Sequence, residues 1–127
     1  MTIRAQFQPQ VDEFIDDLYQ FATGSYLKDG ETEFWEQPFD PKALPELKAI
    51  LERLLDGLDA LPDDPPGGAL SKVVTVSVQE LEAFNARHAD AVIEPEERAS
   101  IREIIQDAAA ATGADDEALG ELPDFEQ

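Results

Sequence analysis

Apolar residues recur three and four positions apart along much of the chain, which is the spacing of one face of an amphipathic α-helix. The pattern first predicts a helix over residues 9–22, with Pro9 in its first turn and Gly24 after its last. Acidic residues fill the opposite side of this stretch. We therefore expect a surface helix with one buried face.

The most regular leucine pattern covers residues 41–61 and predicts a second helix. Asp40 is placed to cap its N-terminus, and Pro41 suits the first helical position. Pro45 would clash with the carbonyl group four residues earlier. We therefore expect a separate first turn, with the regular helix beginning at Pro45.

Two patterns compete over residues 69–92. The segment KVVTVSV, residues 72–78, alternates as a strand does, whereas Leu70, Val74 and Ser77 keep a helical spacing. A lone strand among helices would have no partner for its backbone hydrogen bonds. The sequence thus predicts a helix over residues 69–92, and the alternative is a helix that starts at Ser77 in the capping box SVQE.

The fourth expected helix covers residues 95–112 and ends before Gly113. Connections between the four helices are short, except for one loop at residues 23–40. Short connections favour antiparallel neighbours. The sequence therefore predicts an all-α fold, an up-down four-helix bundle with one long aromatic loop between the first two helices.

The chain of 127 residues is long enough to bury a core, and we expect a single helical domain over residues 1–127. Residues 1–8 and 120–127 are expected to be frayed. No apolar run approaches the roughly 20 residues that span a bilayer, and no signal-peptide pattern is visible. The expected location is the cytoplasm.

The charge is strongly negative, with 29 acidic residues against 9 lysines and arginines and a net charge of −20. Such a chain repels nucleic-acid phosphates and anionic membranes, so we expect no direct nucleic-acid partner and no membrane partner. The charge fits three interpretations, which are adaptation to a salty cytoplasm, an acidic face for a basic partner, and imitation of nucleic-acid phosphates.

Residues that carry catalytic chemistry are scarce. Cysteine is absent and His88 is the one histidine, without a nucleophile or a specific orienting acid beside it in the sequence. A di-iron bundle would need a glutamate three residues before a histidine on two helices, and Asn85 stands in that place. We expect His88 at a helix end, no enzyme activity, no catalytic residue and no cofactor.

The segment 25–36 partly matches a calcium-binding loop. Gly30 and Glu36 fall at the sixth and twelfth positions of that pattern. Ser25 and Leu27 occupy its first and third positions, where the pattern has aspartate and then aspartate or asparagine. No metal site is predicted.

Eight of the ten aromatic residues precede residue 40, and three of them lie in the acidic segment DGETEFWEQPFDP, residues 29–41. These aromatics either fold back as a lid over one end of the bundle, which we favour, or form an exposed anchor for a basic partner. The partner-binding candidates are Phe34, Trp35, Phe39, Glu33 and Glu36.

Three segments carry a family resemblance: PKALPELKAIL at 41–51, TVSVQELEAFN at 75–85 and GADDEAL at 113–119. Over roughly residues 39–119 the chain resembles a small, uncharacterised all-helical bacterial family, a domain of unknown function. The resemblance implies a helix in the second segment. It implies no functional residue, because the family has no established activity.

The expected function is a protein-interaction module without catalysis. Self-association is equally open, since Val73, Val76 and Val78 could form a dimer seam. One alternative is a small-molecule-binding bundle with a pocket under the loop at residues 29–41. Another is an acidic inhibitor or nucleic-acid mimic.

Overall fold

The computed structural model describes residues 2–24, 27 and 37–123, and within these ranges the chain is all-helical and contains no strand. The all-α prediction is confirmed. The elements in chain order are α1 (Ile3–Thr23), η2 (Pro41–Ala43), α2 (Leu44–Asp59), α3 (Gly67–Arg87), α4 (Pro95–Ala110) and α5 (Asp116–Leu119).

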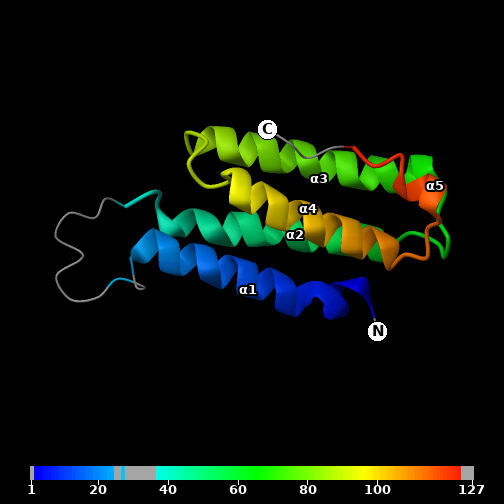
Figure 1. Ribbon diagram of the computed structural model, residues 1–127, viewed down its shortest axis with the longest axis horizontal. Helices are drawn as coiled ribbons and strands as arrows, with labels where there is room; N and C mark the ends of the chain where they lie inside the picture. The colour runs from blue at the N-terminus through cyan, green and yellow to red at the C-terminus, as the bar shows by residue number, and fades with distance from the viewer. Residues whose placement is uncertain (1, 25–26, 28–36, 124–127) are drawn as a thin grey trace.

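The long helices α1 to α4 lie side by side, and each runs opposite to the one before it in the chain (Figure 1). α2 contacts α1, α3 and α4, while α4 also contacts α1. The short α5 packs against α3 and α4. None of the helices in the described ranges combines the length and the apolar character needed to cross a membrane.

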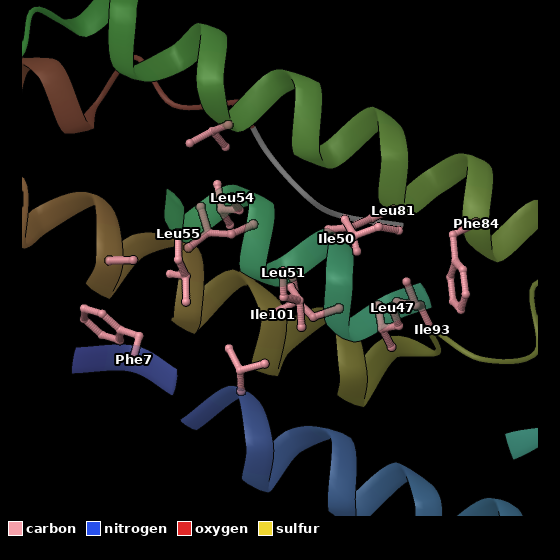
Figure 2. Packing of buried hydrophobic residues seen from close by; sticks show 14 of the residues in the cluster. Phe7, Leu47, Ile50, Leu51, Leu54, Leu55, Leu81, Phe84, Ile93 and Ile101 are labelled. Atoms are coloured by element: carbon pink, nitrogen blue, oxygen red, sulfur yellow. The ribbon is translucent and has the colours of Figure 1, made fainter. Parts of the chain in front are cut away.

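The hydrophobic core is built around α2. Its side chains lie between those of α1, α3 and α4 in Figure 2. Each fully buried aliphatic side chain contributes about 1.5–3 kcal/mol. The buried residues of α2 are Leu44, Leu47, Ile50, Leu51, Leu54, Leu55 and Leu58.

The start of α1 differs from the prediction. The helix begins at Ile3 rather than at residue 9, and residues 3–8, expected to be frayed, form its first turns around buried Ile3 and Phe7. The Asp59 side chain accepts hydrogen bonds from the backbone N–H groups of Ile3 (2.6 Å) and Arg4 (2.9 Å). These bonds satisfy donors that a helix start leaves free, so α1 can begin before Pro9.

The start of α2 confirms the predicted division into two parts. The Asp40 side chain accepts the Lys42 backbone N–H at 2.9 Å and caps a 3₁₀ turn at Pro41–Ala43. The regular helix follows from Leu44, with Pro45 in its first turn. There the missing N–H of proline costs no hydrogen bond.

The third predicted helix is confirmed as α3, and both the strand and a helix start at Ser77 are wrong. Ser77 is buried in the middle of α3, on the face that also buries Leu70 and Val74. The helix ends at Arg87 rather than at residue 92, because Ala89 and Asp90 adopt left-handed backbone angles. The fourth helix starts at Pro95 as predicted and ends two residues early, at Ala110.

Candidate docking groove between α1 and α4

The α1–α4 groove consists of two adjoining hollows of about 420 and 240 Å³. They share Phe14, Asp17 and Ser100 as lining residues and so form one groove. Apolar side chains make its floor: Phe14, Leu18, Phe21 and Ile104. Phe21 is 42% exposed, and Leu18 and Ile104 are buried. The groove thus offers aromatic surface to a ligand.

The rim of the α1–α4 groove is acidic on both sides. Among the described residues that line it, none is basic. The lining carboxylates are Glu13 and Asp17 on α1 and Glu94, Glu96, Glu97 and Glu103 at or on α4. Cations that enter the groove would meet negative charge from two helices at once.

Local sequence explains why acids gather here. On α1, Glu13 and Asp17 are four residues apart and therefore occupy the same helix face. At the start of α4, Glu94 and Glu97 form a capping box, in which the Glu97 carboxylate accepts the Glu94 backbone N–H at 3.2 Å. Glu96 and Glu97 occupy the first turn, where the helix dipole favours negative charge.

Among the described residues, the α1–α4 contact has no ion pair of the kind that joins α1 to α2, α2 to α3 and α3 to α4. Arg4 and Lys48 pair with acids across α1–α2, Arg53 and Arg87 do so across α2–α3, and Arg98 does so across α3–α4. Of the ion pairs between described residues, none joins α1 to α4. The six acids that line the groove therefore have no ion-pair partner across this contact among the described residues.

The pKa of the Glu97 carboxyl is changed by its burial and by neighbouring acids. Partial burial raises its pKa above the ordinary value, and the charges of Glu94 and Glu96 raise it further. The hydrogen bond from the Glu94 backbone N–H opposes these effects. A cation in the groove would lower the pKa of Glu97 by favouring the charged carboxylate.

The residues predicted for partner binding lie near one end of this groove or outside the described ranges. Phe39 is 8% exposed, and its ring centroid is 6.4 Å from that of Phe21 at the groove floor. Phe39 is therefore buried beside Phe21. Its partner-binding role stays a prediction. Glu33, Phe34, Trp35 and Glu36 lie outside the described residues.

His88 stands at the C-cap of α3, as predicted, and its ring lies 4.7 Å from that of Phe84. It does not line the α1–α4 groove. In the described ranges, no group of three or more histidine, cysteine or acidic residues is arranged to hold a metal ion.

Sequence reasoning did not identify the groove residues. By spacing alone, Phe14 belongs to the apolar stripe of the first helix, and Glu96 and Glu97 belong to the first turn of the fourth. The usable signal was the acidic pair at Glu13 and Asp17 beside an aromatic stripe. Which helix would face that stripe depends on tertiary packing.

Comparisons with known proteins add no relative. No family model matches the chain, and neither a curated protein nor a solved structure matches it.

Proposed function

We propose that the chain is a non-catalytic interaction module whose α1–α4 groove binds a basic amphipathic segment of another protein. The carrying observation is that six carboxylates surround an aromatic floor at a helix contact that has no ion pair between described residues. Lysines and arginines of the partner would neutralise the rim, and its apolar face would cover Phe14 and Phe21.

The length of the groove favours a peptide segment over a small molecule. The lining residues extend from Gln10 to Phe21 on α1 and from Glu94 to Ile104 on α4. At 1.5 Å per residue this is about 16 Å, or three turns of helix. A cationic side chain above a phenylalanine ring adds about 0.5–1 kcal/mol at an exposed site.

Further proposals concern the fold of the chain, its family and its location. We propose an up-down four-helix bundle with one long aromatic loop between α1 and α2. Membership of the uncharacterised helical family and a cytoplasmic location remain predictions. The opposite directions of successive long helices support the bundle (Figure 1).

The test is calorimetric titration with a synthetic helical peptide of about 14 residues, long enough to span the groove. Lysine and arginine occupy one face of this peptide and leucine the other. At about 0.15 M salt, where distant charges are screened, we expect saturable binding to one site. The double substitution Asp17→Asn/Glu97→Gln should weaken binding by about tenfold or more. Phe21→Ala should weaken it without any change of charge.

A matched control distinguishes peptide binding at the groove from attraction to the overall negative charge of the chain. Asp63→Asn/Glu117→Gln also removes two negative charges, from exposed residues outside the groove. This variant should bind the peptide as the wild type does. Equal losses in the two double variants would contradict the proposal, because binding would then follow net charge. Equally tight binding of free arginine would favour the small-molecule alternative instead.

A further inference from the structure

A second groove lies between α2 and α3, and its character differs from that of the acidic groove. It has a volume of about 370 Å³. Gly57, Val73 and Val76 line it, with Arg53, Lys72 and Glu80 beside them. Arg53 and Glu80 form an ion pair. Two bases and one acid thus surround an apolar surface on a chain whose net charge is −20.

Val76 is the centre of this surface. Its side chain is 51% exposed, whereas Val73 and Val78 are partly buried against the core. The dimer seam expected from these three valines therefore reduces to Val76 and the outer side of Val73. An exposed valine beside a hollow can contribute to binding if a partner covers both.

The residues around Val76 form a self-complementary pattern on α3. Lys72 stands four residues before Val76, and Glu80 stands four residues after it. Ala69 and Ala83 stand seven residues before and after. An isologous two-fold contact requires a self-complementary surface, and opposite charges at equal distances from a central apolar residue satisfy that requirement.

We propose that this face binds a second copy of the chain, with the two α3 helices antiparallel and crossing at Val76. Residues 72, 76 and 80 form one ridge with four-residue spacing, and such ridges pack together at about −50° in the commonest class of helix contact. A two-fold axis at Val76 then brings Lys72 of one copy opposite Glu80 of the second copy. The reciprocal pair forms on the other side of the axis.

Charge favours this face over the acidic α1–α4 groove for a self-contact. Two chains of −20 repel each other, and the repulsion is smallest where bases meet acids. The stripe from Ala69 to Ala83 covers about 21 Å of helix. A contact of this length belongs to the small, weak class of interfaces, so we expect a reversible dimer. This inference is independent of the acidic groove, whose residues lie on α1 and α4.

Analytical ultracentrifugation over a range of concentrations tests the dimer. We expect Val76→Asp to raise the dimer dissociation constant at least about 30-fold, because it places two carboxylates at the centre of the contact. Tyr19→Asp is the matched control, since Tyr19 is 52% exposed on α1. It should leave the dissociation constant unchanged. Circular dichroism checks that each variant remains folded.

Exchanging the charges of Lys72 and Glu80 tests the proposed two-fold axis. Lys72→Glu alone and Glu80→Lys alone should each weaken the dimer about tenfold, since each change faces like charges across the axis. The double variant Lys72→Glu/Glu80→Lys should recover most of the affinity. A chain that stays monomeric at about 1 mM would overturn the proposal. So would a dimer that survives Val76→Asp, or a double variant no tighter than the single ones.

Discussion

The α2–α3 groove and the α1–α4 groove differ in how their charged residues are paired. Across α2 and α3, Arg53 pairs with Glu80 and Arg87 pairs with Glu46, so the contact is held by attraction. Across α1 and α4, Asp17 stands in the same groove as Glu97 with no basic residue among the described lining. The first contact is complete within the chain, and the second has an excess of negative charge.

This difference shows that a net charge of −20 is not spread evenly. The described ion pairs all join helices that are consecutive in the chain. The α1–α4 contact joins the first long helix to the last, and acids line its groove from both sides. The proposed binding role would account for acids at a contact where bases on one helix could form ion pairs.

The largest predicted effect concerns Asn85, whose hydrogen bonds hold the segment that leads into α4 beside the acidic groove. Asn85 is buried at the end of α3, where its amide donates to the Ile93 carbonyl (3.0 Å) and accepts the Ile93 N–H (2.9 Å). Asn85→Ala leaves both backbone groups unpaired, so the free energy of unfolding should fall by about 2–4 kcal/mol in urea titrations. Gln79→Ala, at an exposed amide of α3, is the control and should change it little. Equal effects of the two substitutions would contradict the role given to Asn85.

The next effect concerns the close approach of α2 and α3. A Cβ atom at Gly57 would lie 3.0 Å from Val73 Cγ1, whereas one at Gly68 would meet nothing within 4 Å. Gly57→Leu should therefore lower the free energy of unfolding by about 1–3 kcal/mol through overpacking. Gly68→Leu should be neutral or stabilising, because leucine favours helix more than glycine does. Thermal unfolding of both variants checks this, and similar melting temperatures would refute the tight contact.

A smaller pair of effects should have opposite signs at the two grooves. Asp17→Asn removes repulsion at the α1–α4 groove and should raise the free energy of unfolding by a few tenths to about 1 kcal/mol. Arg53→Ala removes an exposed ion pair at the α2–α3 groove and should lower it by a similar amount. Both changes in the free energy of unfolding should become smaller at high salt. If the two substitutions changed the free energy of unfolding in the same direction, the contrast between the grooves would be wrong.

The smallest effect is on pH dependence. The raised pKa of Glu97 means that the folded chain binds a proton more tightly there than the unfolded chain does. Lowering the pH through that raised pKa should stabilise the free chain through this group. It should also weaken the binding of the basic peptide, within about tenfold, because the carboxylate loses its charge. Calorimetric titration of Glu97→Gln with the basic peptide should show a shallower decline of affinity as the pH falls. A decline equal to that of the wild type would contradict the role given to Glu97.

The parts of the fold that the sequence predicts well depend on local interactions. Asp40 caps the turn beside it, and Pro95 opens the helix that it begins. The missed start of α1 depends on Asp59, which is 56 residues from Ile3 in the chain. The end of α3 depends on backbone angles at Ala89 and Asp90 that no periodicity reveals.

The acidic groove was less predictable for the same reason. Its halves are local patterns, the acids and aromatics of α1 and the acidic first turn of α4. Their convergence is a tertiary contact, which spacing along the chain does not encode. Trp35 lies in the aromatic segment at residues 29–41 of the sequence, whereas the hollow with aromatic lining among the described residues lies beside Phe14 and Phe21.

The most direct test of the central claim is an amide chemical-shift titration of the ¹⁵N-labelled chain with the basic amphipathic peptide. The account predicts saturable shifts along residues 10–21 of α1 and 94–104 of α4, with little change around Val73 and Val76. Shifts centred on the α2–α3 groove, or spread evenly over all acidic surfaces, would contradict it.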